Sequence, residues 1–84
     1  MNERIQELAK QAREYATTRH PVSNIILSVN SDLFEQKFAE LIVAECLAIA
    51  KNREDELENA NLLKESNAVG IVKYRIARQF GVKE

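Results

Sequence analysis

Residues 31–50, SDLFEQKFAELIVAECLAIA, decide the fold of this chain, because they form one strongly amphipathic helix. Apolar side chains recur there at steps of three and four, the spacing that places residues on one face of a helix. That face holds Phe34, Phe38, Leu41, Ile42, Glu45, Cys46 and Ile49, and a second row of Val43, Leu47 and Ala50 widens it. So wide an apolar face must be covered by other segments or by a second copy of the chain.

The length and the cysteine content favour an oligomer. A chain of 84 residues makes one domain at most, and a domain of this size buries only about 60–65% of the surface that its unfolded chain exposes. One cysteine excludes an internal disulfide, and one cysteine with one histidine cannot complete a four-ligand zinc site in one chain. We therefore expect a homo-oligomer without metal or cofactor. We expect the Cys46 thiol to be buried on the apolar face, the alternative being a reactive thiol or an intermolecular disulfide.

Two further helices flank the central one. Residues 2–18 are expected to form the first helix, with Asn2 as its N-cap. Residues 67–80 are expected to form the last, with Ser66 or Asn67 as its cap and Gly81 as a left-handed stop. Gly70 inside that helix costs about 1 kcal/mol relative to alanine, which a close approach of another helix would justify. The expected fold is a single all-α domain of three helices, about 2–18, 31–52 and 67–80.

Two segments between these helices are less regular. Residues 19–30, RHPVSNIILSVN, contain Pro21 and a short apolar run, and they suit a buried strand, a helical turn or a packed loop. A lone strand would leave backbone groups unpaired unless a second chain paired with it, so we expect a packed loop or a short helix. The central helix, capped by Ser31, is expected to run to Asn52 or further, with a break within residues 53–67.

The charges are balanced in number but unevenly spread. Twelve basic and 13 acidic residues give a formal net charge of −1, which argues against general nucleic-acid binding. Acidic residues dominate residues 53–65, and basic residues dominate residues 66–84. The plain interpretation is solvated helix faces. The alternatives are a small anion site, or an acidic strip that pairs with the basic tail of another copy.

The basic residues define a candidate ligand site. Arg75 and Arg78 are three residues apart, so they share a helix face and could fork onto phosphate oxygens. The candidate ligand-binding set is Lys73, Arg75, Arg78, Arg19, His20 and Tyr74. The alternative is an exposed basic face that keeps the protein in solution.

No motif of an enzyme is present in the sequence. It lacks a P-loop and the GxGxxG, HExxH and GxSxG patterns, and a Cys46–His20 pair is the sole available nucleophile dyad. We therefore expect no catalytic residues and no enzymatic activity. Glu45 is expected either at the edge of the core or against an arginine of another helix or subunit. The residues expected at an oligomer or partner interface are Phe34, Phe38, Leu41, Glu45, Val69, Val72 and Ile76.

Three stretches carry a resemblance to a known group: the opening MNERIQELAKQA, the central FEQKFAELIVAECLAIA and the ending RQFGVKE. Together they resemble a group of small uncharacterised helical proteins of tailed bacteriophages. In that group a similar opening leads to a KFAELIV-EC-like helix, and a short last helix ends in FGV. The resemblance covers roughly half of the chain and carries no functional residues over. It implies a phage accessory protein that acts in the host cytoplasm.

Three functions are consistent with these features. The first is a non-catalytic accessory protein that binds and blocks a host or anti-phage defence component. The second is an oligomeric sponge that sequesters a small anionic, cyclic nucleotide signal, and the third is a structural oligomer of phage assembly. No stretch approaches the roughly 20 apolar residues of a membrane span, and the N-terminus lacks the apolar core of a signal peptide. We therefore expect no membrane partner.

Overall fold

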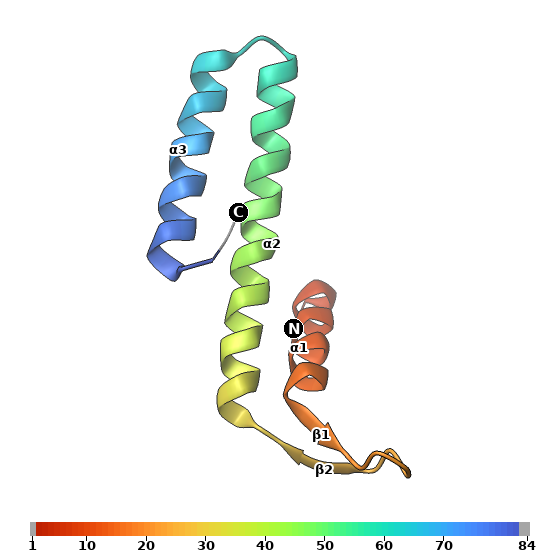
Figure 1. Ribbon diagram of the computed structural model, residues 1–84. Helices are drawn as coiled ribbons and strands as arrows, with labels where there is room; N and C mark the ends of the chain where they lie inside the picture. The colour runs from red at the N-terminus through yellow and green to blue at the C-terminus, as the bar shows by residue number, and fades with distance from the viewer. Residues whose placement is uncertain (1, 83–84) are drawn as a thin grey trace. The chain divides into compact units, whose positions relative to one another are not determined.

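A computed structural model shows the fold, and it describes residues 2–82 (Figure 1). Within this range the elements are α1 (Glu3–Ala16), β1 (Thr17–Arg19), β2 (Ile26–Val29), α2 (Ser31–Asn59) and α3 (Leu63–Phe80). The three helices hold about three quarters of the described residues, which confirms the all-α class. No helix among them is long and apolar enough to cross a membrane.

The chain divides into two compact units that share helix α2. Unit 1 is Met1–Ile42 and contains α1, the two strands and the first half of α2. Unit 2 is Val43–Glu84 and contains the second half of α2 and α3. The sequence predicted one domain, and the structure groups its contacts into these two units.

Helix α1 packs in unit 1 through a row of small side chains. Asn2 caps the helix as predicted, since its side chain accepts a hydrogen bond from the Arg4 N–H at 2.7 Å. Leu8, Ala12 and Ala16 recur every four residues and are buried. The helix ends at Ala16 rather than at residue 18, because Thr17 is extended and begins a strand.

The prediction of a packed loop or short helix for residues 19–30 is wrong. Thr17–Arg19 and Ile26–Val29 form an antiparallel β-hairpin with an irregularity between Thr18 and Arg19. The strand that pairs with residues 26–29 therefore belongs to the same chain. Two of its three residues, Thr17 and Thr18, were predicted to end the first helix. β-Branched residues favour extended backbone, and they are frequent on both sides of this turn. His20 organises the turn, because its Nδ1 accepts hydrogen bonds from the Val22 and Ser23 N–H groups, both at 3.2 Å.

The caps of α2 and α3 also differ from the predictions. Asn30, not Ser31, caps α2, since its side chain accepts from the Leu33 N–H at 3.0 Å. α2 continues to Asn59, where the predicted break occurs, and Asn61 takes a positive φ of 61° in the turn. α3 begins four residues earlier than predicted, at Leu63, and no side chain caps it. The stop at Gly81 is confirmed by its φ of 66° and by a hydrogen bond from the Val82 N–H to the Ala77 carbonyl.

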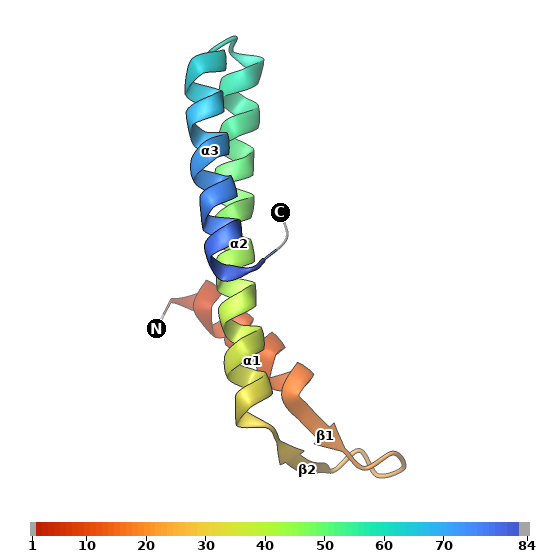
Figure 2. The same ribbon diagram turned by 60° about the vertical axis from the view of Figure 1, so that its left-hand side comes forward.

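Unit 2 is a helical hairpin whose seam contains small and polar residues. Both views show the second half of α2 beside α3 (Figures 1 and 2). From α3, Ser66, Lys73 and Ala77 are buried, and from α2, Leu47 and Leu57 are buried. Ser66, predicted as a cap, lies inside α3, and its hydroxyl donates to the Glu54 carbonyl at 3.2 Å.

Gly70 allows the close approach of α2 and α3 that the sequence suggested. A Cβ atom at this position would collide with the Glu54 carboxylate of the neighbouring helix. The absence of a side chain at residue 70 therefore leaves the space that the Glu54 carboxylate occupies.

The predicted burial of Cys46 is wrong. Cys46 is exposed, and so is Ile49. The second apolar row of the central helix is the one that faces the seam, because Leu47 is buried while Val43 and Ala50 are half-buried. When a helix has two neighbouring apolar rows, the sequence pattern does not determine which row packs against the next helix. Here the row with Cys46 and Ile49 lies beside the contact between α2 and α3.

Candidate protein-binding surfaces

A polar cluster lies in the seam of unit 2. The Lys73 ammonium donates to Glu54 Oε1 at 3.0 Å, and both side chains are largely buried, at 11% and 17% exposed. This hydrogen bond holds the pKa of Glu54 below its usual 4.5, although burial acts in the opposite direction. Lys51 lies 3.1 Å from Asp55 and 3.4 Å from Glu54, and these two carboxylates raise its pKa above 10.5. Within this cluster, the Glu54–Lys73 pair joins α2 to α3.

The predicted anion site is not assembled in either unit. Lys73 is bound to Glu54 in unit 2, and Arg19 is bound to Glu14 in unit 1 at 2.8 Å. His20 uses Nδ1 in the hairpin turn. Three members of the set remain exposed on α3: Tyr74, Arg75 and Arg78.

The predicted interface residues have different surroundings. Phe34 and Phe38 are half-buried in unit 1 and stack with ring centroids 5.6 Å apart, and the Arg13 guanidinium lies 5.8 Å from the Phe34 ring. Leu41, Glu45, Val69 and Ile76 are half-buried, whereas Val72 is exposed.

Unit 1 has a small surface hollow. Its volume is about 60 Å³, room for about two water molecules. Tyr15, Leu33, Gln36, Lys37 and Glu40 line it, and Lys37 Nζ lies 4.8 Å from the Tyr15 ring centroid. No group of three or more histidine, cysteine or acidic residues within residues 2–82 could hold a metal ion.

The hairpin of unit 1 exposes an apolar strand with a free edge. All four residues of β2 are exposed, and residues 21–30 contain no charged side chain. The Asn30 N–H donates to the Ala16 carbonyl and the His20 N–H to the Ile25 carbonyl, which makes 16–30 and 20–25 the hydrogen-bonded pairs. In an antiparallel ladder the neighbouring residues of β2 turn their N–H and C=O groups away from β1. Those neighbours are Val29 and Ile26.

This strand edge was missed by the sequence analysis. The signal was present in the β-branched residues on each side of the His20–Pro21 pair. The exposed apolar residues in and around the hairpin, which we call the hairpin surface, are Val22, Ile25, Ile26, Leu27 and Val29.

Unit 2 exposes a second apolar surface on one side of its seam. The seam residues, which lie between α2 and α3, are Leu47, Ala50, Glu54 and Leu57 of α2 and Ser66, Gly70, Lys73 and Ala77 of α3. On each helix, the residue one position before a seam residue lies about 100° around the helix axis from it. Because α2 and α3 run antiparallel, these positions fall on the same side of the hairpin. This surface, which we call the lateral face, carries the apolar residues Cys46, Ile49, Val69, Val72, Ile76 and Phe80, and the same rule places Arg53, Glu56 and Glu65 on it.

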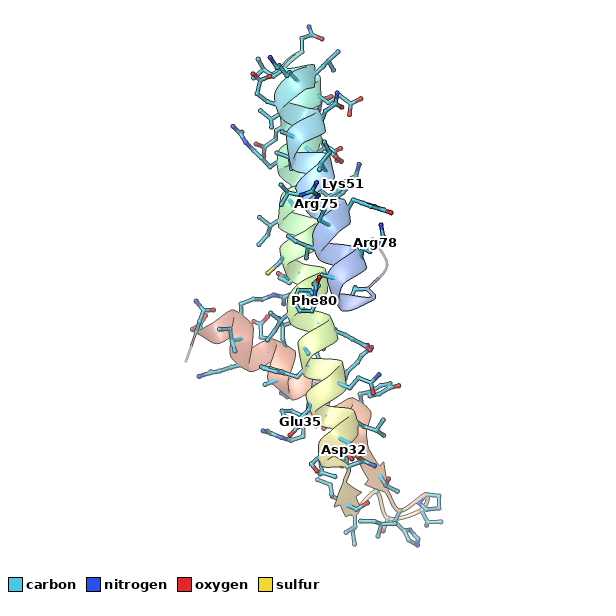
Figure 3. All side chains as sticks on the ribbon, turned by 90° about the vertical axis from the view of Figure 1, so that its left-hand side faces the viewer. Asp32, Glu35, Lys51, Arg75, Arg78 and Phe80 are labelled. Atoms are coloured by element: carbon cyan, nitrogen blue, oxygen red, sulfur yellow. The ribbon has the colours of Figure 1, made fainter. Side chains whose placement is uncertain are left out.

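The lateral face differs from the opposite side of unit 2. Cys46, Ile49, Val72 and Phe80 are exposed on the lateral face. The opposite side, formed by the residues one position after each seam residue, carries Lys51, Asp55 and Arg78. Figure 3 shows Lys51 and Arg78 projecting to the same side of the unit, away from Phe80. On α3 the lateral side carries the continuous apolar stripe, whereas the opposite side mixes Asn67, Ile71, Tyr74 and Arg78.

No protein-family model, no curated protein and no solved structure matches this chain.

Proposed function

We propose that this chain is a non-catalytic binding protein that recognises another protein through the free edge of β2 (Ile26–Val29) in unit 1. The observation that carries the proposal is the exposed β2 strand, whose Ile26 and Val29 present backbone donors and acceptors at a free edge. A partner that adds an extended segment to this edge gains main-chain hydrogen bonds, and alternate side chains supply specificity.

The composition of the hairpin supports an interaction surface. Sheets that avoid edge pairing carry lysine, proline or inward-pointing charges on their edge strands. β2 carries Ile26, Leu27, Ser28 and Val29, so it has neither a charged residue nor a proline. A two-stranded hairpin is marginally stable in water by itself, so an added strand also stabilises the hairpin.

The resemblance to small phage proteins suggests the class of partner. We propose that the partner is a host or anti-phage defence protein in the host cytoplasm, and that binding blocks it. The nucleotide sponge is less well supported, because Lys73, Arg19 and His20 are engaged within the chain. The role of a structural oligomer of phage assembly has no feature of its own that favours it over the binding protein.

The experiment compares capture by the tagged wild type and by three lysine variants in extracts of infected cells. Ile26→Lys and Val29→Lys place charge on the strand edge, and Val22→Lys places the same charge in the turn, outside the strand. We expect the edge variants to lose the captured partner and Val22→Lys to keep it. Amide exchange on the captured complex should show new protection at Ile26 and Val29.

Two results would contradict the proposal. One is equal capture by the edge variants and the wild type. The other is a partner that is lost only when the lateral face of unit 2 is changed. Circular dichroism of each variant checks that the helices are intact.

A further inference from the structure

The α3 part of the lateral face is an apolar stripe that nothing in unit 2 covers. Two packed helices bury one seam, and a stable domain needs a second layer against any further apolar face. On α3 the spacing of Val69, Val72, Ile76 and Phe80 forms one continuous stripe. Val72 is 56% exposed and Phe80 is 63% exposed. Lone apolar residues on a surface are ordinary, but a contiguous stripe of this kind marks an interface.

We infer that the lateral face packs against the lateral face of a second copy, with α3 antiparallel to α3 of that copy. Such a pairing is isologous, since a two-fold axis brings the same patch of both copies together. The product is a layer of helices on helices, as in antiparallel bundles.

Charge complementarity selects the second copy as the occupant. Glu65 and Arg75 both border the lateral face, and neither makes an ion pair or a hydrogen bond within the part of the chain that the structure describes. Ten residues separate them, about 15 Å along the helix. A two-fold axis that crosses α3 near Gly70, midway between them, places Glu65 of each copy opposite Arg75 of the other.

The same axis matches the apolar residues. Val69 and Val72 lie next to it, so they meet their counterparts at the centre of the interface. Phe80 lies about 15 Å from the axis on one side, and Leu62 about 12 Å from it on the other. Phe80 of one copy therefore reaches about the level of Leu62 in the other, and both are exposed in the single chain. Along α3 the central valines are thus followed outward by the Glu65–Arg75 pairs, and then by Phe80 and Leu62 at each end.

The first experiment uses two neighbouring positions of α3 with nearly equal exposure. Val72 lies on the lateral face and Ile71, which is 55% exposed, lies on the opposite side. We expect the wild type to have the mass of a dimer by light scattering after size exclusion at micromolar concentration. Val72→Glu should give the mass of a monomer, and Ile71→Glu should keep the mass of a dimer.

The second experiment tests the charge pairing without disturbing the apolar stripe. Glu65→Arg alone places two arginines opposite each other at both ends of the interface, and Arg75→Glu alone places two glutamates there. Each variant should be largely monomeric by itself. An equimolar mixture restores both pairs, so it should return to the dimer mass as a heterodimer.

Three outcomes would overturn the inference. They are a monomeric wild type, dissociation by Ile71→Glu instead of Val72→Glu, and a charge-reversal mixture that stays monomeric. Because the charge variants alter only exposed side chains, they decide the matter even where Val72→Glu fails to fold.

Discussion

The seams of the two units are built from different side chains. Unit 1 buries an apolar row, Leu8, Ala12 and Ala16, whereas unit 2 buries Ser66 and Lys73 beside its apolar residues. Removing an apolar row from water stabilises roughly in proportion to its area and is indifferent to pH. A buried ammonium is tolerated only with a partner, and in unit 2 that partner is Glu54. The packing of unit 2 therefore relies on the Glu54–Lys73 ion pair and on the lack of a side chain at Gly70. The packing of unit 1 relies on the burial of apolar side chains.

The largest effects are expected where apolar side chains are removed. Leu8→Ala and Leu47→Ala each delete a buried leucine, 4% exposed in both cases, so each should lower the free energy of unfolding by about 2–5 kcal/mol. Hydrogen exchange by residue separates the two units. Leu8→Ala should speed exchange mainly in α1 and the hairpin, and Leu47→Ala mainly in α3. Equal acceleration throughout both units would show that they unfold as one.

Acid is expected to weaken unit 2 selectively. Because its pKa is lowered in the fold, Glu54 adds stability that is fully present above its usual value of 4.5. That contribution is lost as the pH falls below 4.5 and through the folded-state pKa. Glu54→Gln should therefore melt at a lower temperature than the wild type near neutral pH, and the two Tm values should converge in acid.

The matched control for this prediction is Lys51→Met, which removes an exposed partner of Glu54 and leaves Lys73 in place. We expect Lys73→Met to lower the Tm more than Lys51→Met does, because exposed ion pairs contribute little. The reverse order would mean that the buried pair is not what holds the seam.

The smallest expected effect comes from Gly70. In a helix interior, alanine is favoured over glycine by about 1 kcal/mol. When Gly70→Ala is made in the otherwise wild-type protein, the new Cβ displaces the Glu54 carboxylate. The substitution should therefore give no net stabilisation or should lower the free energy of unfolding. In a Glu54→Ala background the collision is absent, and Gly70→Ala should stabilise by about 1 kcal/mol. Equal effects in both backgrounds would contradict the role assigned to Gly70.

Most helical features could be predicted from the sequence because they depend on local chemistry. The Asn2 cap, the Gly81 stop and the break near Asn59 are such features, and the structure confirms them. The hairpin was missed because the helical pattern of residues 2–16 hides where the first strand begins. Thr17 and Thr18 directly continue that pattern, and they pair with Val29 and Ser28, which lie 12 and 10 positions further along the chain.

The structure does not bring the predicted ligand-binding residues together, for a related reason. A helical pattern shows which residues share a face, but not which face is covered. Lys73 looked available beside Arg75 and Arg78, yet it turns into the seam to meet Glu54. Cys46 looked buried, yet the neighbouring row with Leu47 is the one that packs. In both helices the row that packs in the seam is the neighbour of the one that the apolar pattern indicated, and the apolar row of α3 lies beside the seam.

The most direct test of this account is the native mass of the mixture of Glu65→Arg and Arg75→Glu, measured by light scattering beside each variant alone. The account predicts two monomers that combine into a heterodimer. Separate variants that keep the dimer mass, or a mixture that stays monomeric, would contradict it.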